Sequence, residues 1–232
     1  MSEAMQSNPG KQLIRTVDGV DYMRIPIKTH LITHEHHMKD VVDQYARELM
    51  QQGDLLFISE KAVACTQNRA IPMEDIKPRK PAVTLSKYVT KTPHGIGLGI
   101  PETMEMALRE CGVLRILFAA FCSVIGKLLG RKGWFYLVAG TKARGIDGPT
   151  QGTIPPYDHC VVLAPDEPKK VARELAAHLG HPVAIVDIND LGANILGMSH
   201  KEPGEKLLEQ ILGDNPLGQG GESTPMGIIR KG

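Results

Sequence analysis

"CVVLAPDEPKKVARELAAHLGHPVAIVDIND", residues 160–190, is the stretch that decides the fold class of this chain. Its first six residues are typical of a strand. The segment that follows has apolar residues at helical spacing, with Asp166 as the expected cap and Gly180 as the stop. The next apolar run, residues 182–187, is typical of a second strand. Strand, helix and strand at this spacing predict a crossover unit in a sheet that is at least partly parallel.

The first half of the chain predicts further strands and helices. Residues 22–32 mix β-branched residues with a proline, which indicates an edge strand followed by a loop. Helical spacing over residues 39–52 ends at a glycine, and residues 54–59 follow as a strand. A helical region interrupted near Gly112 is expected within residues 101–133. The predicted fold class is therefore α+β, with mixed sheets and the crossover unit in the C-terminal half.

The composition excludes several functional classes. The 27 Lys and Arg residues nearly balance the 26 Asp and Glu residues, which gives no electrostatic reason to expect nucleic acid as a partner. The four cysteines are widely spaced and form no CxxC pair, so they predict neither a disulfide framework nor a structural zinc site. We therefore expect reduced thiols, small-molecule or protein partners, and a cytoplasmic location.

Two segments bear on targeting. Residues 1–15 are expected to be loose, and they lack the apolar region of a signal peptide. The most apolar stretch, residues 113–130, contains Arg115 and Lys127, and its uncharged part is shorter than the roughly 20 residues that span a bilayer. It predicts a buried or partner-facing helix, with a membrane-associated segment as the alternative, and no membrane is expected among the partners.

Polar loops supply the candidate chemistry. Asp147 in a Gly/Pro-rich loop, and Asn189 with Asp190 after the second strand, are each typical of turns when taken alone. Hard divalent cations prefer oxygen ligands, which these side chains supply. Ligands bind at the carboxyl ends of strands in open α/β sheets, so the two loops together could form a cation site at one end of the sheet. The loop "GQGGEST", residues 218–224, offers backbone N–H groups able to wrap phosphates, although taken alone it is more typical of a flexible tail.

Other reactive side chains favour structural roles. The histidines of "THLITHEHHMKD", residues 29–40, lie in an expected loop without a second Cys/His group, which favours a solvated loop over a metal site. Cys65 has no base positioned by the sequence and is expected to be a core or pocket thiol.

In chain order, five stretches resemble the coenzyme F420-0:gamma-glutamyl ligase family, whose members attach glutamate to a deazaflavin cofactor with GTP and a divalent metal. They are "IPIKTHLI" (25–32), "GDLLFISEKAVACTQNRAIP" (53–72), "GIDGPT" (145–150), residues 163–192, and "GQGGESTPMGIIRKG" (218–232). Their order along about two thirds of the chain carries the resemblance.

The resemblance implies two groups of site residues. The metal ligands would be Asp147, Asn189, Asp190 and Gln219. The nucleotide-binding residues would lie in the first stretch, after the first long strand, in the acidic loop and in the glycine loop: Ile25, Pro26, Ile27, Lys28, Glu60, Lys61, Thr150, Gly218, Gly220, Gly221, Thr224 and Pro225. No catalytic residue is assigned. The implied cofactors are Mg²⁺ or Mn²⁺ and GTP, with ATP as the alternative nucleotide.

The resemblance also implies an activity and an assembly. The expected protein is a homodimeric ligase that activates a small-molecule or cofactor carboxylate for attack by an amino acid. The domain expected to carry this activity is residues 16–232, with an apolar helical insertion at about 96–133. The alternative is a non-catalytic paralogue that binds nucleotide or metal and acts as a sensor or scaffold. Two departures from the family pattern favour that alternative: Ala64-Cys65 replaces Ser-Lys, and the carboxylate of Asp190 is shifted by one position.

Overall fold

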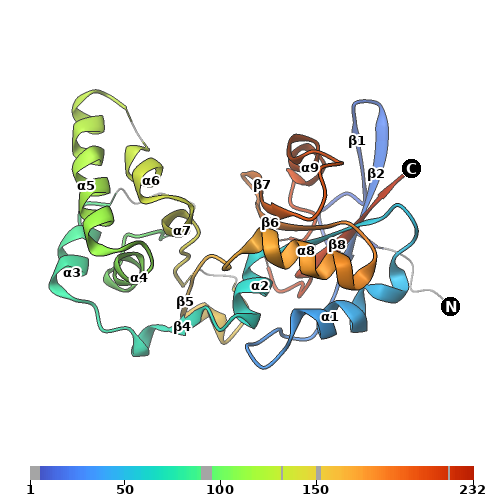
Figure 1. The fold of residues 1–232 in the computed structure, drawn as a ribbon, viewed down its shortest axis with the longest axis horizontal. Coiled ribbons are helices and arrows are strands. Elements are labelled where there is room, and N and C mark those ends of the chain that lie inside the picture. The colour runs from blue at the N-terminus through green and yellow to red at the C-terminus, as the bar shows by residue number, and fades with distance from the viewer. Residues whose placement is uncertain (1–5, 90–95, 132, 150–152, 219) are drawn as a thin grey trace. The chain divides into compact units, whose positions relative to one another are not determined.

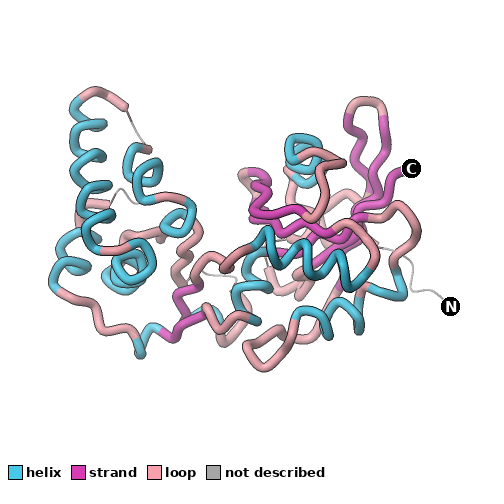
Figure 2. The backbone as a smooth tube through the Cα atoms, in the orientation of Figure 1, coloured by secondary structure: helices cyan, strands magenta, loops and turns pink. Residues whose placement is uncertain are grey.

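The computed structural model describes residues 6–89, 96–131, 133–149, 153–218 and 220–232 (Figures 1 and 2). The chain divides into two compact units. Unit 1 combines residues 1–68 with residues 165–232, and unit 2 is the intervening segment, residues 69–164. The helices within the expected insertion at 96–133 belong to unit 2, while the expected domain limits stay a prediction.

The described residues of unit 1 form a six-stranded sheet in the order β1-β2-β8-β3-β6-β7. The strands are β1 (Ile14–Val17), β2 (Val20–Ile27), β3 (Leu55–Ser59), β6 (Val183–Asn189), β7 (Gly192–Met198) and β8 (Met226–Lys231). β3 and β6 are parallel, whereas the other neighbouring pairs are antiparallel. The prediction of a partly parallel sheet in an α+β fold is confirmed.

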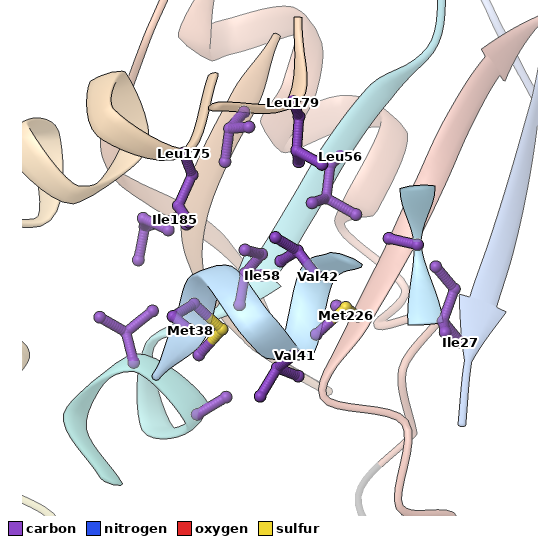
Figure 3. Close-up of a cluster of buried hydrophobic side chains, with 14 of the residues drawn as sticks. Ile27, Met38, Val41, Val42, Leu56, Ile58, Leu175, Leu179, Ile185 and Met226 are labelled. Atoms are coloured by element: carbon purple, nitrogen blue, oxygen red, sulfur yellow. The ribbon is translucent and has the colours of Figure 1, made fainter. Parts of the chain in front are cut away.

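Side-chain alternation along β3 explains why helices cover both faces of this sheet. Leu56 and Ile58 belong to a core cluster shared with α1 (Met38–Tyr45) and α8 (Pro168–Leu179) (Figure 3). Leu55 and Phe57 point to the other face, where they join a cluster with α9 (Glu205–Leu212). A strand that is buried on both faces needs a continuous apolar run, which "LLFI" supplies. Unit 1 also contains α2 (Glu60–Thr66) and a short helix, η1 (Arg47–Leu49).

The expected edge strand is an interior strand. β2 lies between β1 and β8, and β1 is the outermost strand. The proline is tolerated because Arg24 N donates to Leu13 O on the β1 side, and Pro26, two residues later, directs its nitrogen to the same side. The β1 ladder pairs β2 residues only as far as Met23, so Pro26 removes no ladder hydrogen bond.

Residues 160–190 do not form the predicted crossover unit. The strand, the helix and the second strand are all present, and Gly180 ends the helix with φ +78° as predicted, although Glu167 rather than Asp166 occupies the N-cap. The first strand, β5 (Cys160–Val162), nevertheless pairs with β4 (Ala70–Pro72) in a separate sheet in unit 2. The parallel neighbour of β6 is instead β3, over 120 residues earlier in the chain. The spacing of residues 160–190 could not show whether β6 pairs with β5 or with β3.

Unit 2 is mainly helical. Its helices are α3 (Lys80–Ser86), α4 (Pro101–Cys111), α5 (Val113–Leu128), α6 (Trp134–Ala139) and α7 (Thr141–Arg144), with short helices η2 (Met73–Asp75) and η3 (Tyr157–His159). Gly112, with φ +86°, separates α4 from α5, as the sequence predicted. Met104, Leu108 and Ile116 are among the buried residues of its core.

Among the described residues, no single helix is long and apolar enough to cross a bilayer. Only α4 and α5 taken together reach that length and apolar character, and the two helices are bent by 116°.

A buried carboxylate lies in the α4 region of unit 2. The Glu105 side chain is 1% exposed and accepts hydrogen bonds from Arg79 N (3.0 Å), Arg79 Nε (2.9 Å) and Arg109 Nε (2.9 Å). Burial by itself raises the pKa of Glu105. The backbone N–H of Arg79 and the two guanidinium groups outweigh that effect, so the pKa lies below its ordinary value of 4.5.

We predict that Glu105→Gln lowers the free energy of unfolding of unit 2 by about 2 kcal/mol at pH 7, because a hydrogen-bonded charge is lost. A depressed carboxylate pKa stabilises the fold above the unfolded-state pKa, and this contribution disappears as the pH falls through the folded-state pKa. The difference between wild type and variant should therefore shrink below about pH 4.5. The two free energies of unfolding are measured by urea titration, with the fluorescence of Trp134, the single tryptophan of the chain, as the signal. A difference that stays constant down to pH 3 would contradict the assignment.

Candidate functional site

Three segments that are distant in the sequence meet where strands of the unit 1 sheet end, a place that we call the sheet edge. β2 ends where β8 begins, with Ile27 opposite Met226, and β3 ends beside the same residue. Beyond the ladders, Thr29 N donates to Ser223 O (3.0 Å) and Ser59 N donates to Pro225 O (2.8 Å). The end of β2, the end of β3 and the glycine loop before β8 therefore form one continuous edge.

This close pairing depends on a glycine. A Cβ on Gly227 would lie 2.5 Å from Phe57 Cζ and 2.8 Å from Ile25 O, so no larger residue fits between β2 and β3. Gly227 thus allows β8 to pair with both neighbours where the glycine loop enters the sheet.

Most of the predicted nucleotide-binding residues of unit 1 lie at this edge. Ile25 and Ile27 are buried in the core, so their side chains are unavailable to a ligand. Lys28 follows β2 directly and is exposed. Glu60 and Lys61 open α2 immediately after Ser59 and are partly exposed. The edge therefore presents Lys28 and Lys61 as its predicted cationic groups.

An unpaired ring nitrogen lies two residues beyond Lys28. His30 Nδ1 is 2.7 Å from Tyr45 Oη, and the rings of His30 and His36 are 4.4 Å apart. His36 is itself fixed by Thr33, whose Oγ1 is 3.0 Å from His36 Nδ1. His30 Nε2 is buried and has no hydrogen-bond partner among the described residues. The expected solvated histidine loop is thus partly ordered, and it places one unsatisfied polar atom near the sheet edge.

The glycine loop is held by its own polar groups. Gly218 has φ +79°, and its carbonyl accepts a hydrogen bond from Asn215 Nδ2 (2.9 Å). Thr224 Oγ1 donates to Leu217 O (2.7 Å) and accepts from Asn8 Nδ2 (2.8 Å). These contacts leave the Thr224 hydroxyl engaged within the protein.

A carboxylate occupies part of this loop. Gly220 N donates to Glu222 Oε2 (2.7 Å), and a Cβ on Gly218 would lie 2.8 Å from the Glu222 carboxyl carbon. An amide predicted to bind a phosphate is therefore paired with an anion of the same loop. Gly221 is exposed, Pro225 is partly exposed, and Gln219 lies outside the described residues.

Asn189 and Asp190 lie at the tip of a β-hairpin. β6 runs to Asn189 and β7 starts at Gly192, so Asp190 and Leu191 form the two-residue turn. Asn189 Oδ1 accepts a hydrogen bond from Leu191 N (2.9 Å). Asp190 is exposed, and its Oδ1 is 2.9 Å from Lys11 Nζ. The apolar run of β6 thus ends in a turn in which Asn189 Oδ1 and Asp190 Oδ1 each accept a hydrogen bond.

The N-terminal segment connects this turn to the glycine loop. Asn8 Nδ2 donates to Pro216 O (3.1 Å) and Leu217 O (2.9 Å) as well as to Thr224, while Lys11 binds Asp190 and donates to Asp214 O (3.0 Å). Because Asn8 and Lys11 are three positions apart, the loop and the hairpin tip are near neighbours. This part of the segment that was expected to be loose is therefore fixed, and nothing in its polar composition indicated these contacts.

Asp214 lies beside Lys11 and forms ion pairs with two arginines. It pairs with Arg24, which is fully buried, and with Arg15 (Nη1 to Oδ1, 2.9 Å). Burial raises the pKa of Asp214, but the hydrogen bonds and charge of Arg24, with Arg15, outweigh burial and hold that pKa below its usual value. The Lys11 contacts are thus built on a charged cluster that stays ionised at neutral pH.

The described residues do not assemble a metal centre. Among them, no group of three or more His, Cys, Asp and Glu side chains is arranged to hold a metal ion. Asp147 belongs to unit 2, where its backbone bridges Val162 (N to O, 2.8 Å), and Thr150 lies outside the described residues. Asn189 and Asp190 have the oxygen donors that a hard divalent cation prefers. A cation at Asp190 would lie beside the ammonium group of Lys11, which pairs with Oδ1.

One comparison identifies the family. The family model described as F420-0:Gamma-glutamyl ligase matches residues 26–189, more than two thirds of the chain. A comparison with curated proteins found no match. The matched range begins at the last two residues of β2 and includes β3 and β6, whereas the glycine loop and β8 follow it. The chain belongs to the F420-0:gamma-glutamyl ligase family.

Proposed function

We propose that this protein joins the carboxylate of a small molecule or cofactor to the amino group of glutamate, using GTP, with ATP as the alternative nucleotide. The family is a ligase family, which supports an enzymatic role. The observation that carries the proposal is the meeting of Lys28, the start of α2 and the glycine loop at one sheet edge. Ligands bind at such edges because the strands end there and leave backbone groups available.

The proposed reaction has two balanced steps. A carboxylate oxygen attacks the terminal phosphorus of the nucleotide, and the bond to the bridging oxygen breaks, which gives an acyl phosphate and a nucleoside diphosphate. The amine then attacks the acyl carbon and loses a proton, and inorganic phosphate leaves with the electrons of the C–O bond. Phosphoryl transfer depends mainly on positioning and on neutralising charge. Lys28, Lys61 and the loop amides are the groups proposed to do this.

His30 supports a ligand at the same edge. A buried ring nitrogen without a partner costs free energy unless a bound molecule or water satisfies it. We propose that His30 Nε2 makes a hydrogen bond to the bound nucleotide. Thr224 and Pro225 shape the loop through internal contacts, and Ile25, Pro26 and Ile27 contribute backbone and support rather than side chains.

Metal dependence is part of the proposal. Asn189, Asp190 and Gln219 of unit 1 are proposed ligands for Mg²⁺ or Mn²⁺, which would neutralise phosphate charge when bound. Asp147 of unit 2 is proposed as a ligand on the family resemblance alone. The ammonium group of Lys11 pairs with Asp190 and would compete with the cation for that carboxylate. We also propose a homodimer in the cytoplasm, which size-exclusion chromatography with light scattering and cell fractionation test.

Turnover tests the proposed ligase activity. The protein is incubated with GTP or ATP, Mn²⁺, glutamate and candidate acids including the deazaflavin, and phosphate release is measured. We expect release that requires both the acid and the amine.

Lys28→Met should weaken nucleotide binding about tenfold, or about 1.4 kcal/mol, because a cation beside the phosphates is lost. Lys231→Met, an exposed lysine at the far end of β8, is the matched control. Nucleotide binding without release in any mixture would favour the sensor or scaffold alternative.

Glu222 gives a second prediction. Because its carboxylate occupies Gly220 N, a phosphate must displace it, and two anions at one loop repel each other. Glu222→Gln should therefore bind GTP about 3- to 10-fold more tightly, which corresponds to about 0.7 to 1.4 kcal/mol. Calorimetric titration of GTP measures the affinity. Glu48→Gln, an exposed glutamate near the opposite edge, should change nothing. Equal affinities for Glu222→Gln and wild type would rule out phosphate binding at Gly220.

Lys11 gives a third prediction. Lys11→Met releases Asp190 from its ion pair, so Mn²⁺ affinity should rise several-fold if Asp190 is a ligand, whereas Asp190→Asn should weaken it at least tenfold. Mn²⁺ paramagnetic resonance titrations, with and without GTP, measure free and bound metal. Lys206→Met, an exposed lysine on α9, is the control. If Asp190→Asn binds Mn²⁺ as wild type does, the ligand assignment is wrong.

A further inference from the structure

Unit 2 exposes the apolar face of α5. Leu114 (83% exposed), Phe118 (59%), Phe121 (60%) and Leu128 (82%) recur at spacings of three, four and seven residues, which places them on one side of the helix. Leu117 and Val124 extend the same face. We refer to these six residues as the α5 face. Apolar patches of this kind on a protein surface mark sites of protein or membrane contact.

The opposite side of α5 is fixed in the unit. Ile116 and Ala119 are buried in the unit 2 core. Gly126 lies against α6: a Cβ there would be 3.0 Å from both Trp134 Cγ and Arg131 O. The helix is thus held by one side, and the exposure of the other side is a property of the folded unit.

The sequence segment that contains α5 carries charge of one sign. Residues 111–146 contain six Lys and Arg residues and no Asp or Glu. Arg115, Lys127, Arg131, Lys142 and Arg144 are all exposed, and Lys132 is the sixth cation of the segment. The near-neutral balance of the whole chain conceals this segment, because the acidic residues lie elsewhere.

We propose that the α5 face binds the surface of an anionic lipid bilayer. An apolar helix face bordered by Lys and Arg inserts into the headgroup region, where its side chains leave water and its cations meet lipid phosphates. Two copies of this chain meeting through α5 would instead bring two segments of charge +6 together, which opposes association. The bilayer is the occupant that complements both the apolar face and the charge.

The helix lies along the bilayer surface rather than crossing it. Its 16 residues extend about 24 Å at 1.5 Å per residue, shorter than the roughly 30 Å of a hydrocarbon core. Neighbouring α4 is buried in the unit 2 core through Met104, Ala107 and Leu108 and is not available to extend it. The sequence predicted a buried or partner-facing helix here, with a membrane-associated segment as the alternative, and the proposal adopts that alternative.

Vesicle binding by the full chain tests the proposal. The protein is sedimented with vesicles of phosphatidylcholine alone or with 30 to 50% phosphatidylglycerol, a composition chosen to vary the lipid charge. We expect binding to the anionic vesicles, at least tenfold weaker binding to neutral ones, and weakening by 0.5 M NaCl. Trp134 packs beside α5 and is the single tryptophan, so brominated lipids should quench its fluorescence on binding.

Matched variants separate this surface from general adhesion. Phe118→Ser with Phe121→Ser should reduce binding to anionic vesicles at least tenfold, and the thermal midpoint should stay close to that of wild type because both rings are exposed. Tyr88→Ser removes a ring that is 75% exposed elsewhere in unit 2 and should bind like wild type. Lys127→Glu with Arg131→Glu should abolish the preference for anionic lipid.

Two results would overturn the proposal. One is the absence of binding to anionic vesicles, or binding that Phe118→Ser with Phe121→Ser leaves unchanged. The other is a concentration-dependent dimer that the same double variant dissociates while vesicles bind nothing, which would make the α5 face an interface between copies.

Discussion

The pairing of β3 with β6 on one side and with β8 on the other positions the candidate site of unit 1. β3 is short and buried on both faces, so its register is set by packing of Leu56 and Ile58 against one layer and Leu55 and Phe57 against the other. A slip of one residue would exchange these two sets. The fixed register places the end of β3 beside the start of β8, and it thereby determines where α2 and the glycine loop meet.

This constraint also explains which features the sequence could predict. The run Leu55–Ser59, the helix ending at Gly180 and the break at Gly112 are set by local patterns, and the structure has all three. The partner of β6 could not be predicted, because parallel pairing joins strands that are over 120 residues apart. The strand at 160–162 has the same apolar character as β3, and only the tertiary structure shows that it pairs with β4.

The polar contacts of the candidate site were less predictable than its strands. Asn8, Lys11 and Glu222 are ordinary residues of polar loops, and their roles arise from where the chain brings them. They have one effect in common: a group predicted to bind ligand is satisfied by the protein itself, Asp190 by Lys11 and the Gly220 amide by Glu222. Such pairs stabilise the loops without ligand, since unpaired charges and amides would be costly. They also mean that binding exchanges contacts rather than adding them, which limits affinity and favours ligands of high charge such as a polyphosphate.

The α5 face shows a different limit of sequence analysis. A helix that is apolar on every side is usually buried in a core or in a membrane, and its periodicity cannot show which side is covered. In unit 2 the core covers Ile116 and Ala119, while Phe118 and Phe121 stay in contact with water. Polar residues at those two positions should cost little folding stability, because both rings are mostly exposed and neither belongs to the unit 2 core. Their aromatic character, within a segment that has six cations and no anions, is therefore explained by an external partner rather than by folding.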